Sequence, residues 1–222
     1  MVTPFPGGVG ISGLRVYDWP AVDGVCGGSP HVHLACSEAY FVISGTGSVQ
    51  TLTRRAFTET PLSEGVVVWF TPGTIHRLVN DGDLRIVVIM QNSGLPEAGD
   101  AVFTFPSDVL ADSARYAECA RADDEESARR RRDLALEGFL ELRRGRPAAL
   151  ESFYEAAVRM KQDGLDAWEE RWREGALASA ERTGEHLERL RDGDIGHLVE
   201  ADVQVVHGKG PKFGMCGRLD VF

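Results

Sequence analysis

Residues 29–47, "SPHVHLACSEAYFVISGTG", place His31 and His33 one residue apart and follow them with Glu38. Side chains two residues apart on a β-strand point to the same face, and Pro30 together with the two glycines before Ser29 argues against a helix here. Neighbouring imidazoles on a rigid strand suit a divalent metal ion. The stretch therefore predicts a short β-strand that carries part of a metal site.

Two further residues extend this predicted site. Glu38 lies an odd number of residues after His33, so strict alternation predicts that it points to the opposite face. A bulge or bend in residues 34–37 must intervene, or Glu38 is not a ligand. His76 follows the Pro72-Gly73 turn in "TPGTIHRLVN" and opens another predicted strand.

The chain changes character near residue 106. Residues 9–105 contain short segments rich in Val, Ile, Tyr, Phe and Thr, separated by turn signals such as "GTG" and "NDGD", which is typical of a sandwich or barrel. Residues 106–200 are rich in Ala, Leu, Glu and Arg at helical spacing. We expect a β-domain over residues 1–105, a helical extension over 106–200 packed on it, and a tail over 201–222 that returns to it.

The two motifs resemble the signatures of a known family. "HxHxxxxExxxxxxG" (residues 31–45) and "PGxxHxxxN" (residues 72–80) are similar to the first and second motifs of the cupin superfamily. Val25 stands where the family has a glycine, and Pro72 adjoins Gly73 instead of standing two residues before it. The resemblance implies a mainly β fold, a small antiparallel β-barrel of the jelly-roll type with a C-terminal α-helical extension. It also implies one divalent transition-metal ion (Fe, Mn, Ni, Co or Zn) bound by His31, His33, Glu38 and His76.

Several activities are compatible with this resemblance. The leading hypothesis is a sugar or sugar-phosphate isomerase or epimerase that stabilises an enediolate, with a weak likeness to mannose-6-phosphate-isomerase-like cupins. The alternatives are an iron-dependent dioxygenase and a non-catalytic module that binds a metal or small molecule. Tyr40 and Gln91 are the candidate catalytic side chains. A polar cavity would favour the sugar, and an apolar, aromatic cavity the dioxygenase.

Composition restricts the partners. A net charge of −10 argues against binding to nucleic acid, and the longest apolar runs are too short to span a membrane. Four cysteines without C-x-x-C spacing, and no visible secretory signal, predict a cytoplasmic protein that acts on a small molecule. The resemblance also allows a homodimer. We interpret the Arg129 to Arg132 run as a solvated helix face, and the tail with Lys209, Lys212 and Arg218 as a strand that returns to the barrel.

Overall fold

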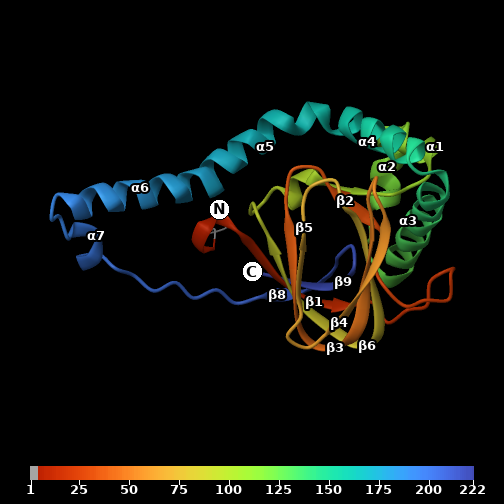
Figure 1. Ribbon diagram of the computed structural model, residues 1–222, viewed down its shortest axis with the longest axis horizontal. Coiled ribbons are helices and arrows are strands. Elements are labelled where there is room, and N and C mark those ends of the chain that lie inside the picture. The colour runs from red at the N-terminus through yellow and green to blue at the C-terminus, as the bar shows by residue number, and fades with distance from the viewer. Residues whose placement is uncertain (1–4) are drawn as a thin grey trace.

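The computed structural model describes residues 5–222 and contains nine strands within that range (Figure 1). The strands are β1 (Gly10–Val16), β2 (His31–His33), β3 (Glu38–Leu52), β4 (Phe57–Ser63), β5 (Val67–Phe70), β6 (Ile75–Met90), β7 (Ala101–Phe103), β8 (Lys209–Phe213) and β9 (Gly217–Val221). The α-helices are α1 (Ser107–Leu110), α2 (Ser113–Ala120), α3 (Glu125–Gly145), α4 (Ala148–Lys161), α5 (Leu165–Trp172), α6 (Ala178–Arg191) and α7 (Gly196–Val199). Four shorter helical turns are η1 (Pro6–Gly8), η2 (Pro96–Asp100), η3 (Gln162–Gly164) and η4 (Arg173–Leu177).

The strands form one curved antiparallel sheet of the jelly-roll type. Its main path runs β4-β3-β6-β1-β9-β8, with β5 beside β3 and β2 between β6 and β7. The jelly-roll prediction is confirmed, but hydrogen bonds do not close this sheet into a barrel, because β4 and β8 end the path in the described chain. The described chain also contains more helical residues than strand residues. The helical extension is therefore a larger part of the chain than the prediction of a mainly β fold suggests.

The long strands β3 and β6 pair along most of their length and bend together. Their register shifts between Val42 and Gly47. At the bend Gly45 has φ 80°, and a Cβ atom there would lie 2.3 Å from the carbonyl oxygen of Asp83. Glycine is therefore required at the bend, since another side chain would meet both strain and backbone. This bend lets the sheet wrap around an interior.

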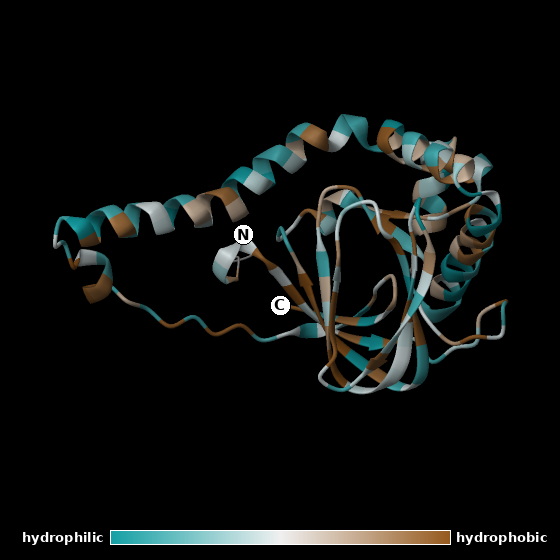
Figure 2. Cartoon of the chain, in the orientation of Figure 1, coloured by the Kyte–Doolittle hydropathy of each residue, from teal (hydrophilic) through white to brown (hydrophobic). Residues whose placement is uncertain are grey.

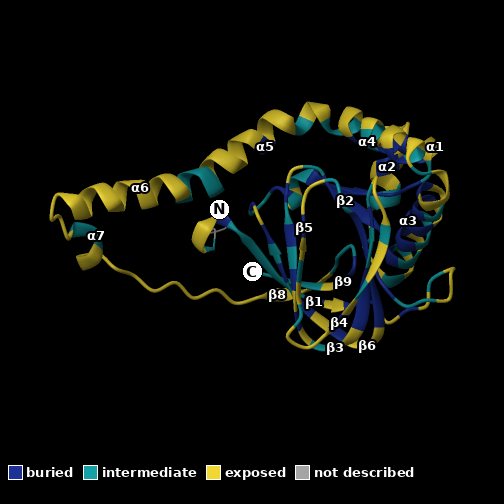
Figure 3. Cartoon of the chain, viewed as in Figure 1, coloured by how far each residue is buried: buried dark blue, intermediate teal, exposed yellow. Residues whose placement is uncertain are grey.

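Two hydrophobic cores stabilise the structure. One fills the inside of the sheet, with Tyr40, Val42 and Val88 among its residues. The other lies between the sheet and the first helices, where Ile75 and Phe103 pack with residues such as Phe139. Helix α3 begins with a capping box between Asp124 and Ser127, and its buried face covers β7 and the following segment (Figures 1 and 3).

The later helices are less buried than α3 and α4. Helix α5 still buries Trp168, but α6 has no buried residue and extends away from the sheet (Figures 1 and 3). Hydrophobic residues nevertheless occur along this arm and along the extended residues 200–208 (Figure 2), including Leu187, Leu190 and Val203. Only part of the helical region therefore contacts the sheet. The domain boundaries remain a prediction, and residues 1–4 of the first domain lie outside the described chain.

The last two strands complete the sheet beside β1. β9 pairs with β1 from Ser12 to Val16, and β8 forms a hairpin with β9. Backbone hydrogen bonds from Tyr17 to Cys216 (3.1 Å) and from Ser29 to Met215 (2.9 Å) fix the tip of this hairpin near β2. No helix in residues 5–222 is long and apolar enough to cross a membrane.

Candidate metal centre

Three histidines and one glutamate converge inside the sheet. His31 and His33 lie on β2, Glu38 begins β3, and His76 on β6 is the cross-strand partner of His31. All four side chains are buried, and one ligand atom from each lies within 4.8 Å of the others. β2 ends at His33, and the chain bends through residues 34–37 before β3 begins, so Glu38 turns inward despite its odd spacing.

Hydrogen bonds fix the outer nitrogen of each imidazole. His31 Nδ1 lies 2.9 Å from the carbonyl oxygen of Ser29, and His76 Nδ1 lies 3.0 Å from that of Thr74. His33 Nδ1 lies 2.9 Å from Oδ2 of Asp100. Carbonyl and carboxylate oxygens only accept, so we assign the proton to Nδ1 in all three rings. Each Nε2 then presents a lone pair to the centre, as a metal ligand must.

While all three rings are neutral, the inner atoms therefore form a group of acceptors without a donor. His76 Nε2 lies 3.1 Å from His31 Nε2 and 3.0 Å from Glu38 Oε2. In these tautomers neither contact is a hydrogen bond, and Glu38 Oε2 is buried without a hydrogen-bond partner in residues 5–222. Lone pairs packed this closely repel one another unless a cation lies between them. The donor set fits a divalent transition metal ion, with three nitrogens and one carboxylate oxygen.

The pKa values describe the same centre without an ion. Burial lowers the pKa of His31 well below 6.5, and the nearby His76 and His33 lower it further. Burial also lowers the pKa of His33, but Glu38 and Asp100 outweigh burial and raise this pKa to about 9. A proton on His33 thus takes the place of the cation when no metal is bound. Metal binding near neutral pH must release that proton.

Asp100 orients His33 and was not anticipated from the sequence. Its side chain is fully buried and also accepts hydrogen bonds from the backbone N–H groups of Leu34 (3.0 Å) and Ala35 (2.6 Å). These contacts fix both the bend after β2 and the ring of His33. Asp100 is far from His33 in the chain, and no local pattern around "EAGDAVF" distinguishes it as a site residue.

A cavity of about 430 Å³ opens beside this centre. His31, His33, Glu38 and Tyr40 line one part of it. Most of the remaining wall is apolar or aromatic, and it includes Leu14, Val88, Met90, Phe103, Tyr116, Phe213, Met215 and Leu219. Arg131, Lys161 and Glu97 are the charged side chains outside the metal ligands.

The two candidate catalytic residues have different positions. Tyr40 is buried and lines the cavity, and burial followed by the charge of Glu38 raises its pKa well above 10, so its phenol keeps its proton. Gln91 does not line the cavity. Val88 and Met90 face inward, so Gln91, the residue after Met90, points outward, where it accepts a hydrogen bond from the backbone N–H of Ser37.

Comparison with known proteins agrees with the motifs. The family described as "Cupin domain" matches residues 23–90. Residues 23–90 are a cupin domain. Comparison with curated proteins gives no match.

Solved structures similar to this chain include other cupins. A cupin protein from Bacteroides fragilis is 20% identical, with a TM-score of 0.29 over 39% of this chain and 65% of its own. The capsular polysaccharide assembling protein CapF from Staphylococcus aureus is 24% identical, with a TM-score of 0.34 over 46% of this chain and 29% of its own. A variant of Streptomyces PAC13 with uridine is 15% identical, with a TM-score of 0.30 over 40% of this chain and 62% of its own. The chain thus spans less than two thirds of each of these proteins.

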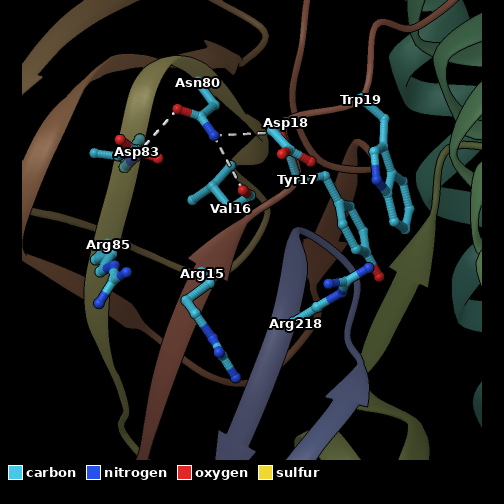
Figure 4. Close-up of a pocket in the computed structure, with 10 residues that line it drawn as sticks. Arg15, Val16, Tyr17, Asp18, Trp19, Asn80, Asp83, Arg85 and Arg218 are labelled. Carbon is cyan, nitrogen blue, oxygen red and sulfur yellow. Dashed lines mark hydrogen bonds between the residues drawn. The ribbon is translucent and has the colours of Figure 1, made fainter.

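The asparagine of the second cupin motif has a structural role. Asn80 donates a hydrogen bond to the carbonyl oxygen of Val16 (3.0 Å) and accepts from the backbone N–H groups of Gly82 and Leu84 (both 3.1 Å). It thereby joins the bend of β6 to β1. Figure 4 shows this residue among those that line a second pocket, and none of the four residues of the candidate metal centre belongs to that pocket.

The helices also supply residues to the cupin cavity that the sequence did not indicate. Arg131 and Arg132 are buried, so the interpretation of Arg129 to Arg132 as a solvated face is wrong for these two. They fall on the same helical stripe as Ala128, Ala135 and Phe139, and this 3.6-residue period was the available signal. Tail residues Lys209 and Lys212 lie on the exposed strand β8.

Proposed function

We propose that this protein is a mononuclear divalent-metal enzyme that acts on a small metabolite with a mainly apolar body. The main observation behind this proposal is the convergence of His31, His33, Glu38 and His76 beside a mainly apolar cavity. His31, His33, Glu38 and His76 would hold the ion. When bound, an iron(II) ion supplies redox chemistry towards O₂, and other divalent ions supply Lewis-acid polarisation.

The cavity wall favours the dioxygenase hypothesis over the sugar isomerase. A sugar has many hydroxyl groups, and each one left without a partner in a buried site costs binding free energy. The described wall offers few uncharged polar groups, whereas Val88, Met90 and Phe103 can enclose an apolar body and exclude water. An iron-dependent dioxygenase acting on such a molecule is therefore the activity we propose, and the sugar isomerase ranks second.

Among the residues that line the cavity, Tyr40 is the best candidate for a catalytic role. Its phenol is protonated and lies beside Glu38, two residues away on the same face of β3. A neutral phenol can donate a hydrogen bond to a substrate oxygen or transfer a proton to it. We propose that Tyr40 orients the substrate at the centre.

The test measures metal content and turnover together. Purified protein is analysed for bound metal, loaded with Fe(II), and assayed for O₂ uptake with a panel of small aromatic and aliphatic metabolites. We expect uptake in the wild type and none in His76→Ala, which lacks a ligand. Interconversion of a ketose and an aldose by the Mn(II), Ni(II) or Zn(II) form would instead support the isomerase. Bound metal with neither activity would identify a binding module and overturn the enzymatic proposal.

A further inference from the structure

Among residues 5–222, three arginine side chains are deeply buried, and one of these three has no acidic partner there. Arg77 forms an ion pair with Asp23 (2.6 Å), and Arg132 forms one with Asp133 (2.9 Å). Arg131 is 6% exposed, yet no carboxylate of the described chain lies within 4.0 Å of its guanidinium. An arginine stays charged in proteins, so this site holds a buried and uncompensated positive charge.

The hydrogen bonds of Arg131 satisfy only part of the guanidinium. It donates to the carbonyl oxygens of Ala120 (3.3 Å), Phe213 (3.3 Å) and Gly214 (2.5 Å), which ties helix α3 to the β8–β9 hairpin. Its Nε has no partner in the described chain. These contacts explain how Arg131 is held in place. They do not neutralise its charge.

The guanidinium of Arg131 lines the cavity of the metal centre. It packs 5.1 Å above the ring of Phe103, which lines the same cavity. Lys161, at the end of α4, is a second cation of this wall without an ion pair in the described residues, and its Nζ lies 5.2 Å from the ring of Tyr116. Glu97 is the one carboxylate of the wall besides Glu38. Two cations without an ion pair in the described residues line this cavity, in a chain of net charge −10, which indicates a site for an anion.

We infer that Arg131, with Lys161, anchors an anionic group of the substrate, either a carboxylate or a phosphate. Nη1 of Arg131 donates only to Ala120, so its second hydrogen can donate a charge-assisted hydrogen bond to an oxygen of such a group. The substrate is then a small organic anion whose apolar body contacts Phe103, Val88 and Met90 and whose other end reaches the metal ligands. This inference rests on the proposed function, since it names the substrate class of the same cavity.

The experiment compares acids with their neutral analogues. Zn(II)-loaded protein, which does not consume O₂, is titrated calorimetrically with benzoate, phenylacetate, hexanoate and phenyl phosphate, and with the amides of the three acids. We expect at least one anion to bind about 10- to 100-fold more tightly than its neutral counterpart, the range for a charge-assisted hydrogen bond. Arg131→Met should abolish this preference. Arg130→Met, on the exposed face of the same helix, should leave it unchanged.

Two further measurements keep the inference testable. Arg131→Met removes three contacts and can unfold the hairpin, so Lys161→Met serves as a second variant and should weaken binding of the anion several-fold. Titration of metal-depleted His76→Ala separates the two proposals. A preference for the anion that persists in this variant comes from Arg131 and Lys161 and not from the metal ion. The inference is overturned if no anion binds better than its neutral analogue, or if folded Arg131→Met keeps the preference. In either case the metal proposal stands by itself, provided that metal is bound.

Discussion

The imidazoles of the centre differ in the groups that hold their outer nitrogens. Backbone carbonyls orient His31 and His76, whereas a carboxylate orients His33. A backbone carbonyl cannot be removed by substitution, but Asp100 can. The side chain of Asp100 is therefore the most informative position for testing how the ligands are oriented.

We predict that Asp100→Asn weakens metal affinity by about 10- to 100-fold. An amide at this position can donate to Nδ1 of His33, which would move the ring proton to Nε2 and remove a lone pair from the centre. Competition titrations against a chromophoric chelator measure the affinity. Asp108→Asn, an exposed aspartate paired with Arg115, is the control. Equal affinities in wild type and Asp100→Asn would show that the tautomer of His33 does not limit binding.

The Asp23–Arg77 ion pair predicts a dependence of stability on pH. Burial raises the pKa of Asp23, but the hydrogen bond and charge of Arg77 outweigh it, so the pKa lies below its ordinary value of 3.8. A depressed folded-state pKa stabilises the protein above about pH 3.8, and this contribution is lost as pH falls through the lower folded value.

Asp23→Asn should therefore destabilise the protein by about 1.5–3 kcal/mol at pH 7, because Arg77 stays buried without its charged partner. Urea unfolding of wild type and variant at pH 7, 5 and 3.5 measures the difference. It should be constant between pH 7 and 5 and shrink below about pH 4. Asp123→Asn, in an exposed pair with Arg121, should show no such difference.

Strand alternation, with its two-residue period, predicted that His31 and His33 lie together on one face of β2. The Pro72-Gly73 turn indicated that His76 opens another strand. The inward position of Glu38 could not follow from that period, because it depends on the bend that Asp100 holds from another part of the chain. For the same reason the outward position of Gln91 could not be predicted, since the register at the end of β6 is set by its pairing with β1 and β3.

Helix α3 packs so closely on the segment after β7 that one of its glycines cannot be replaced. A Cβ atom at Gly138 would lie 2.1 Å from the carbonyl oxygen of Thr104, whereas one at Gly184 in α6 would have no atom within 4 Å. Alanine favours a helix by about 1 kcal/mol over glycine, but overpacking costs about 1–3 kcal/mol.

We therefore predict opposite effects for the same substitution in these two helices. Gly138→Ala should lower the free energy of unfolding. Gly184→Ala, by contrast, should raise the helix content or slightly increase the free energy of unfolding. Thermal unfolding followed by circular dichroism measures both. If Gly138→Ala is as stable as the wild type, then α3 does not approach Thr104 as closely as the structure shows.

A metal ion bound only by the folded protein stabilises the molecule as a whole. At a concentration a hundredfold above its Kd the ion contributes about 2.7 kcal/mol, which is roughly 5–10 °C in Tm for a chain of this size. Protons compete with the ion for His33, whose pKa without metal is about 9, so this contribution grows as pH rises towards 9 and is lost as pH falls. The stability of the protein without metal changes with pH in the opposite direction. The raised pKa of His33 stabilises it below pH 6.5, and that stabilisation is lost as pH rises through about 9.

Chelation should accordingly lower the Tm strongly at pH 7.5 and much less near pH 5. Melting curves with and without EDTA, and after return of Mn(II), Fe(II), Ni(II) or Zn(II), measure this difference. Curves that coincide at pH 7.5 would remove the metal centre, and with it the proposed enzyme.

The helical region and the tail could be predicted as elements but not as parts of the cavity. Nothing in the local sequence places Arg131, Lys161 or Leu219 beside a centre built from residues 31–76, because long-range packing decides it. Helix α6 was also expected to pack on the sheet, but it has no buried residue. The sequence "ERTGEHLERLR" (residues 181–191) carries charge on most sides, which leaves α6 little apolar surface for such packing.

A fragment of residues 1–105 should aggregate. Without α3 and α4 it exposes the apolar face that includes Ile75, Phe103 and Phe105, and without β9 it leaves one edge of β1 unpaired. Light scattering and chemical unfolding of the fragment test this expectation. A soluble fragment with a cooperative transition would show that the β-domain is stable without the helices.

The place of β1 between β6 and β9 has a consequence for synthesis in the cell. At about 5–20 residues per second, a ribosome needs roughly 10–40 s to make the chain between β1 and β9. All four residues of the candidate metal centre have been synthesised by then, while Cys216 and Leu219, which also line the cavity, do not yet exist. The nascent chain therefore passes through a stage with its ligands present and a sheet edge open beside them, and that edge is where a chaperone or a neighbouring nascent chain would bind first.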